Sequence, residues 1–335
     1  MKKYLSLLLV LVMLFALAAI GPAASADYDT VNFRLGTTSA EGSLVASTFV
    51  EWGRRMSELS DGKLSVEVYP GSVLGTTNEM AQNCQMGTLD LAVLQPAGLA
   101  DMGASKMSLL TLPYLFPSYQ VFVDTLFSDV GDELLQDVTD NVAGVVGFGY
   151  LPDGGRCYFT TGGKSITCLD DIKGLKLRLQ GFAIDTDTAN ALGFSATAVA
   201  MSELYSALQT GVVDGAENSI STIDGSVLYE VIDTLTLDNH TFNLPVMMVS
   251  EKRWNSLSDD SKALMKETWE STILDYYVPK LLDTQEELLV KFEEKGVNVI
   301  RELPDYEKWV EAVQPVWEKY GAGMEDVIDS IRNAA

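Results

Sequence analysis

The chain has 335 residues, of which 47 are acidic and 23 are basic, and its formal net charge at pH 7 is −24. So acidic a protein is poorly suited to binding nucleic acid or an anionic membrane face, because like charges repel. The length exceeds that of one ordinary domain, so we expect two packed α/β lobes.

Residues 1–26 have the pattern of a secretory signal peptide. Two lysines precede an apolar run over residues 5–20, and Ala24-Ser25-Ala26 fits a signal-peptidase cleavage site. The alternative is a membrane anchor, but the apolar run is shorter than the ~20 residues that span a bilayer. We therefore expect cleavage after Ala26 and a mature protein that is exported.

The rest of the chain alternates between strand and helix patterns. Alternating or short continuous apolar runs predict strands, and apolar residues spaced by three and four predict helices. The expected strands are residues 32–36, 64–68, 89–94, 142–150, 175–180, 212–218, 242–249 and 297–300. The expected helices are residues 45–59, 74–87, 122–138, 202–210 and 257–295, with a terminal helix after residue 300.

The helix expected at residues 257–295 is unusually long. Ser258 can cap its start, two acidic residues follow near the positive end of the helix, and Pro279 should kink it. At ~1.5 Å per residue the helix would exceed ~50 Å. Because one lobe does not need such a length, we expect the helix to bridge both lobes.

The chain contains three cysteines. Residues 157–168 have the pattern of a hairpin centred on Gly162-Gly163, which would place Cys157 opposite Cys168. A disulfide between these two residues suits an exported protein, and we predict one, although a longer turn would shift the register. Cys84 lies on the apolar side of a short helix and is expected to be a buried thiol.

The most informative segment runs from Asp170 to Ser219. A strand that carries Arg178 is followed by a crossover, a short helix and a second strand that ends at Asn218. In open α/β sheets, ligands bind in the crevice outside the carboxyl ends of the strands. A guanidinium group offers parallel donors that match both oxygens of a carboxylate. The alternative for Arg178 is a solvated charge on a strand face.

The motifs GLKLR (174–178) and ELYSALQTGVVDGAEN (203–218) resemble the signature of the solute-binding proteins of TRAP transporters. These are periplasmic receptors that present organic acids to a sodium-coupled membrane permease. The resemblance covers essentially the whole mature chain. It implies an α/β fold of the two-lobed periplasmic binding protein type, in which each lobe is a mixed sheet flanked by helices and a long helix bridges both lobes. We place lobe I at residues 27–153 plus 244–283, and lobe II at residues 154–243 plus 284–335.

The resemblance also implies the site residues. Arg178 would be the main carboxylate clamp, Asn218 its neighbour, and Arg156 a second cation that reaches the ligand. Gln95 follows a buried strand where family members that bind amino sugars can carry a carboxylate, so its neutral amide favours hydroxyls or a second acid group in the ligand. The remaining candidates are Thr38, Ser39, Thr76, Thr77, Gln180 and Met201.

No signature of catalysis accompanies these residues. The sequence contains no HExxH, G-x-S-x-G or C-x-x-C motif, and its single histidine, His240, fits a structural role better than a catalytic one. We expect no enzyme activity, no cofactor and no metal site. The alternatives to a TRAP receptor are the binding protein of an ATP-driven importer, a ligand sensor, and an exported hydrolase or lyase.

The identity of the ligand stays open at this point. A C4-dicarboxylate, a sugar acid such as a uronate, and other organic acids all fit an arginine clamp. The expected partners are this small organic acid and the membrane subunits of a TRAP permease, with no nucleic acid, and the receptor is expected to be a monomer.

Overall fold

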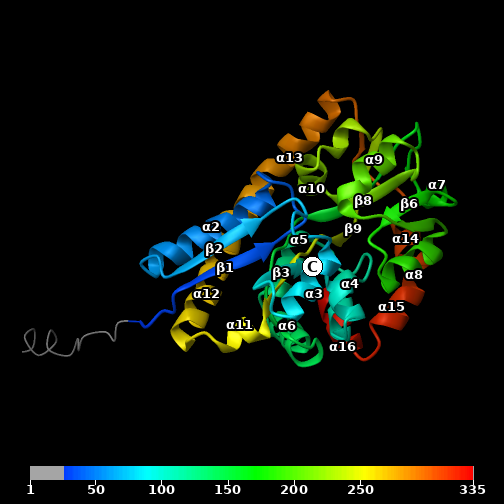
Figure 1. Cartoon of the computed structure of the whole chain (residues 1–335). Helices are drawn as coiled ribbons and strands as arrows, with labels where there is room; N and C mark the ends of the chain where they lie inside the picture. The colour runs from blue at the N-terminus through cyan, green and yellow to red at the C-terminus, as the bar shows by residue number, and fades with distance from the viewer. Residues whose placement is uncertain (1–25, 335) are drawn as a thin grey trace, which may run out of the picture.

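The structure is a computed structural model that describes residues 26–334. The predicted signal peptide therefore lies outside the described residues, except for Ala26. Two β-sheets, each flanked by helices, make up the molecule, as Figure 1 shows. This arrangement confirms the predicted α/β class with two mixed sheets. None of the helices within residues 26–334 is both long enough and apolar enough to cross a membrane.

The first sheet has five strands in the order β2-β1-β3-β10-β4. Its strands are β1 (Val31–Gly36), β2 (Leu64–Tyr69), β3 (Leu91–Leu94), β4 (Val145–Tyr150) and β10 (Val246–Ser250). Strands β1, β2 and β3 are parallel, while β10 runs antiparallel to both of its neighbours, β3 and β4. The sheet is therefore completed by a strand that lies about 100 residues further along the chain than β4.

The second sheet has six strands in the order β11-β9-β5-β8-β6-β7. Its strands are β5 (Gly155–Thr160), β6 (Lys176–Leu179), β7 (Ser195–Ala198), β8 (Gly215–Ser219), β9 (Thr234–Phe242) and β11 (Asn298–Ile300). Strand β6 is parallel to β7 and β8, and β5 is antiparallel to β8 and β9. The strand order does not test where one lobe ends and the other begins, so the predicted boundaries of the two lobes stay a prediction.

Helices cover both faces of each sheet, and their apolar sides form the core. The helices are α2 (Leu44–Leu59), α3 (Thr77–Gln85), α4 (Pro96–Asp101), α5 (Tyr119–Leu126), α6 (Asp129–Asn141), α7 (Leu169–Ile172), α8 (Ala183–Leu192), α9 (Leu204–Gln209), α10 (Ile220–Gly225), α11 (Glu251–Asn255), α12 (Asp259–Thr272), α13 (Val278–Glu294), α14 (Tyr306–Ala312), α15 (Gln314–Tyr320) and α16 (Glu325–Arg332), with 3₁₀ turns η1 (Ser105–Thr111), η2 (Met201–Glu203) and η3 (Leu228–Glu230). In β10, Val246 and Met248 pack on one side of the sheet, while Met247 and Val249 pack on the other. Such a strand, apolar on both faces, suits the interior of a covered sheet.

Two neighbouring chain segments connect one sheet to the other. Residues 151–154 lead from β4 to β5, and residues 243–245 lead from β9 back to β10. The segments are hydrogen-bonded to each other: Asp153 N donates to Asn243 O at 2.7 Å, and Asn243 N donates to Gly154 O at 2.8 Å. These crossing segments lie directly beneath the space between the two sheets.

The predicted long helix is present, with one irregular turn. Helices α12 and α13 are joined by a π-helical turn, η4 (Ile273–Tyr277), immediately before Pro279. Figure 1 shows this combined helix running along one side of the molecule, past both sheets. The π turn places the Tyr277 hydroxyl where it donates to the buried carboxylate of Asp153. The helix is therefore attached to the crossing segments near its irregular turn.

The predicted disulfide is wrong. Cys157 and Cys168 are both free thiols, because residues 157–168 do not form a hairpin. Cys157 lies within β5, whose partners are β8 and β9, while Cys168 lies outside the sheet at the start of α7. The third cysteine, Cys84, is buried as expected, and burial raises the pKa of its thiol to about 12.

Two further elements differ from their predictions. The single helix expected at residues 122–138 is two helices, α5 and α6, because Ser128 caps the start of α6 by accepting a hydrogen bond from Val130 N. Strand β9 was not predicted, although Thr and Leu alternate over residues 234–237, because the polar residues 238–240 interrupt the apolar pattern. In the structure, the side chains of Asp238 and His240 are buried against each other.

Candidate functional site

A cavity of about 320 Å³ lies between the two sheets, above the crossing segments. All of the predicted site residues except Arg156 line it, and their role in ligand binding stays a prediction. Its hydrogen-bonding side chains are Thr37, Thr38, Ser39, Ser43, Ser72, Thr76, Thr77, Asn78, Gln95, Arg178, Gln180, Ser202, Asn218, Ser221, Thr222, Ser226 and Asn243, and Met201 is among the apolar lining residues.

Arg178 is the single charged residue among those that line the cavity. It is only 2% exposed, and its Nε donates to the carbonyl of Val199 at 2.8 Å, which fixes the direction of the guanidinium. Its Nη1 is buried and has no hydrogen-bond partner in the described part of the chain. Burial lowers the pKa of Arg178 to about 10, so the side chain still carries its positive charge at neutral pH.

Asn218 lies beside Arg178 because their strands are neighbours. In the parallel pair of β6 and β8, Arg178 is opposite Ala216, and Asn218 is two residues further along on the same face. Within residues 26–334, the amide nitrogen of Asn218 has a single weak contact, to the Met201 sulfur at 3.8 Å. Its N–H donors are thus available to an anion held by Arg178.

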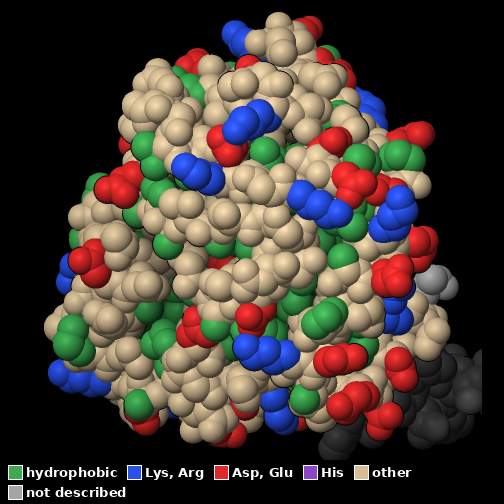
Figure 2. Space-filling model, turned by 90° about the vertical axis from the view of Figure 1, so that its right-hand side faces the viewer, with side chains coloured by type: hydrophobic (Ala, Val, Ile, Leu, Met, Phe, Trp, Pro, Cys, Tyr) green, Lys and Arg blue, Asp and Glu red, His purple; other side chains and the backbone are tan. Residues whose placement is uncertain are grey.

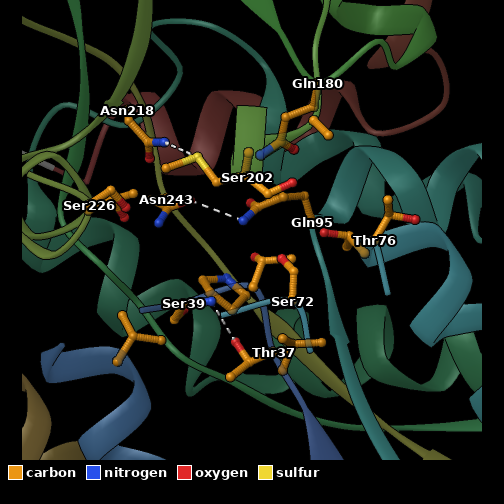
Figure 3. A pocket seen from close by; sticks show the side chains of 18 of the residues that line it. Thr37, Ser39, Ser72, Thr76, Gln95, Gln180, Ser202, Asn218, Ser226 and Asn243 are labelled. Atoms are coloured by element: carbon orange, nitrogen blue, oxygen red, sulfur yellow. Dashed lines mark hydrogen bonds between the residues drawn. The ribbon is translucent and has the colours of Figure 1, made fainter. Parts of the chain in front are cut away.

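The opposite wall of the cavity comes from the first sheet and carries hydroxyl groups. Figure 3 shows Asn218, Ser202 and Gln180 on one side of the space, facing Thr37 and its neighbours on the other. Thr76 caps helix α3 in a capping box with Glu79, which points the first turn of this helix at the cavity. This wall can therefore offer hydroxyls and backbone amides to a ligand.

Gln95 and Asn243 lie between these walls, as Figure 3 shows. Gln95 Nε2 donates to Asn243 Oδ1 at 3.0 Å, and its Oε1 accepts from Leu244 N at 3.4 Å. Asn243 Nδ2 in turn donates to Asp153 at 2.7 Å. The amide of Gln95 is thus held in a fixed orientation by residues of the crossing segments.

Arg156 does not line this cavity. It borders a smaller neighbouring cavity of about 70 Å³, and it is 7% exposed. Its Nε and Nη2 donate to the two carboxylate oxygens of Glu217, and its Nη1 donates to Asn243 Oδ1 at 2.6 Å. The guanidinium that sequence reasoning assigned to the ligand is therefore already paired with a carboxylate.

Glu217 and His240 extend this ion pair away from the cavity. Nε2 of His240 lies 3.5 Å from the Glu217 carboxylate, and its Nδ1 lies 2.7 Å from Asp238. Burial alone would raise the pKa of Glu217, but Arg156 and His240 outweigh burial and lower this pKa to about 2. Burial alone would lower the pKa of His240, but Asp238 and Glu217 raise it to about 9.

The raised pKa of His240 makes a pH-dependent contribution to stability. The folded-state pKa of about 9 lies above the unfolded value of about 6.5, so the contribution is complete below pH ~6.5 and is lost as the pH rises through 9. We expect the melting temperature of the wild type to fall between pH 6.5 and pH 9 more steeply than that of His240→Gln. Calorimetry of both proteins across this range would measure the difference, and parallel curves would contradict the assignment.

Sequence reasoning missed several residues of this region. Asn243 and Asp153 lie on the crossing segments, and Glu217 occupies the position before Asn218. Asp153 is fully buried and accepts hydrogen bonds from Ser219 and from residues on the long helix and α10. The signals in the sequence were Asp153 beside Gly154 and Asn243 two residues before Pro245, where the chain passes from one sheet to the other.

The surface outside the cavity reflects the acidic composition. Figure 2 shows acidic side chains spread over one face of the molecule, with lysines and arginines among them. Within residues 26–334, no group of three or more His, Cys, Asp or Glu side chains could hold a metal ion. An anionic ligand therefore meets a repulsive surface and must be attracted at short range by the cavity itself.

Comparisons with known proteins agree with this architecture. Residues 35–323 match the family described as bacterial extracellular solute-binding protein, family 7. The chain is 28% identical over 313 residues to the sialic acid-binding periplasmic protein of Vibrio cholerae, which covers 92% of this chain and 94% of that protein. It is 30% identical over 263 residues to the C4-dicarboxylate-binding periplasmic protein of Rhodobacter capsulatus, with coverage of 78% and 77%.

A solved structure extends the comparison to the whole fold. The TRAP periplasmic solute-binding protein of a Bradyrhizobium species, in complex with galacturonate, superposes with a TM-score of 0.83 at 27% identity and covers 91% of this chain and 100% of that chain. The family match spans both sheets and the cavity between them. The chain therefore belongs to family 7 of the bacterial extracellular solute-binding proteins, the periplasmic receptors of TRAP transporters.

Proposed function

We propose that this protein captures an organic acid through Arg178 and delivers it to a sodium-coupled TRAP permease. The observation that supports this proposal most directly is that Arg178 lines the cavity while its buried Nη1 has no hydrogen-bond partner in the described part of the chain. Leaving such a donor unpaired is unfavourable, so a bound carboxylate would satisfy it. The export signal at residues 1–26 belongs to the same proposal.

Lobe closure completes the proposed mechanism. The cavity lies between the two sheets, and the connections between them are the crossing segments and the long helix. Closure around the ligand removes water from the cavity, which strengthens the ion pair between Arg178 and the carboxylate. The ligands named for the relatives are all organic acids, in keeping with such a clamp.

A receptor fits the cavity better than an enzyme does. The lining includes no histidine, cysteine, aspartate or glutamate, so no side chain in it resembles the usual general base. The remaining alternatives are a ligand sensor and a receptor for another kind of importer. Uptake of the bound acid by cells that contain this receptor together with a TRAP permease, but not by cells that lack the permease, would separate TRAP transport from these alternatives.

The direct test is a thermal-shift screen of organic acids on the mature protein, followed by calorimetry of the compounds that bind. A ligand of the folded state raises the melting temperature by mass action, and we expect at least one carboxylate to do so without being consumed. The methyl ester of each such compound is the matched control and should lose the effect. No stabilisation by any carboxylate, or turnover of the compound, would contradict the proposal.

A further inference from the structure

The cavity has a charge balance that restricts its ligand beyond the general class of organic acids. Arg178 contributes the one formal charge among the lining residues, while the other hydrogen-bonding groups are hydroxyls, amides and backbone atoms. The relatives do not decide the number of carboxylates, since one is named for a C4-dicarboxylate and another is bound to a uronate. The number has to be inferred from the residues of this chain.

The second arginine of this region cannot balance a second carboxylate. Both oxygens of Glu217 already accept hydrogen bonds from Arg156, and these two side chains are 5% and 7% exposed. The nearby His240 is likewise balanced by Asp238, at 2.7 Å. The two ion pairs are neutral together, so among the described residues around the cavity Arg178 is the cation that forms no ion pair.

Further negative charge surrounds the cavity rather than positive charge. The carboxylate of Asp153 lies beneath it, bonded to Asn243, and Asp185 borders the small neighbouring cavity. A ligand with two carboxylates would bury its second one near these acids with no cation to pair with. Burying an unpaired carboxylate is costly, which disfavours dicarboxylates. A cationic ligand finds no acidic side chain in the lining either.

The wall opposite Arg178 favours hydroxyl groups in the ligand. The hydroxyls of Thr38, Ser39, Ser72 and Thr77 line the cavity and form no hydrogen bonds with other side chains or backbone groups in the described part of the chain. A hydroxyl can both donate and accept, so it matches the hydroxyls of a sugar better than it matches a carboxylate, which only accepts. The cavity volume of about 320 Å³ lies at the small end of the usual range of ~300–1,000 Å³.

We propose that the ligand is a hydroxylated monocarboxylate, a sugar acid with a single carboxylate that binds Arg178 and Asn218 while its hydroxyls face Thr38, Ser39, Ser72 and Thr77. This inference rests on the proposed function. It adds that the receptor discriminates against a second carboxylate on the same carbon skeleton, and against the neutral sugar that lacks a carboxylate.

The test uses matched compounds in several stereochemical series. Calorimetry on the mature protein compares galacturonate with galactarate and galactose, glucuronate with glucarate and glucose, and mannuronate with mannarate and mannose, with the corresponding aldonates and succinate alongside. In at least one series we expect the monocarboxylate to bind at least 100-fold more tightly than the dicarboxylate, and the neutral sugar to show no binding.

The outcomes separate this inference from the proposed function. If a dicarboxylate of the series, or succinate, binds as tightly as the best monocarboxylate, the receptor still takes organic acids but the single-carboxylate inference is wrong. If unhydroxylated monocarboxylates from the wider screen bind and the sugar acids do not, the hydroxyl part of the inference is wrong. If no acid of any kind binds, the inference falls together with the proposed function.

Discussion

Replacing Arg178 by alanine is expected to weaken ligand binding by roughly 30-fold or more. Truncating one partner of a buried, hydrogen-bonded charge pair typically costs ~2–5 kcal/mol of binding free energy. Arg178→Lys keeps the charge but loses the planar pair of donors, so it should restore only part of the affinity. Calorimetry with the acid identified by the screen measures both effects. Binding by the alanine variant at the affinity of the wild type would contradict the clamp.

Removing the guanidinium of Arg178 should leave the fold intact. The guanidinium of Arg178 is buried and forms no ion pair in the described part of the chain, so removing it takes away an unfavourable desolvation of the ligand-free protein. We expect the melting temperature of ligand-free Arg178→Met to be at least that of the wild type. Arg301→Ala, which removes an exposed arginine from ion pairs far from the cavity, is the matched control and should bind ligand normally.

Glu217→Gln is expected to have the largest effect on stability. The change preserves the shape of the side chain but leaves the buried Arg156 without its carboxylate, and it removes one of the two acidic partners of His240. Breaking a buried ion pair from one side typically destabilises a protein by ~3–5 kcal/mol. Denaturant unfolding of both proteins measures the loss of unfolding free energy, provided that this free energy falls with denaturant concentration at the same slope in each.

A second glutamate provides the control for this prediction. Glu58 pairs with Arg54 on the exposed side of α2, where water screens the interaction, so Glu58→Gln should leave the unfolding midpoint unchanged. If Glu217→Gln and Glu58→Gln shifted the midpoint equally, the pair of Arg156 and Glu217 would not be the buried, interdependent contact that the structure describes.

The position of Arg178 could be predicted because its determinants are local. The alternation of residues 175–180 indicates a strand, and the helix and strand that follow place Asn218 on a neighbouring strand. The burial of Arg178 could not be predicted, because it shares its face of the strand with the polar residues Lys176 and Gln180. It is buried because the segment after β7 covers it and accepts its Nε–H through Val199.

The sequence could not indicate that Arg156 lies outside the main cavity, and the reason is physical. As residue types the two arginines are equivalent, and what distinguishes them is a partner 61 residues away, Glu217. The failed hairpin has the same origin. The turn pattern at Gly162-Gly163 is compatible with a hairpin, but β5 pairs with β8 and β9, so non-local pairing overrides the local signal.

The insertion of β10 between β3 and β4 has a consequence for the order in which the chain can mature. Until residues 246–250 have been synthesised, the first sheet lacks an inner strand. The edge of β3 that faces away from β1, and the edge of β4 that pairs with β10, then have no partner strand. Exposed strand edges and apolar faces promote aggregation during folding. We therefore expect the first sheet to be completed only after β10 has been synthesised, a late step that would suit the export proposed for this chain.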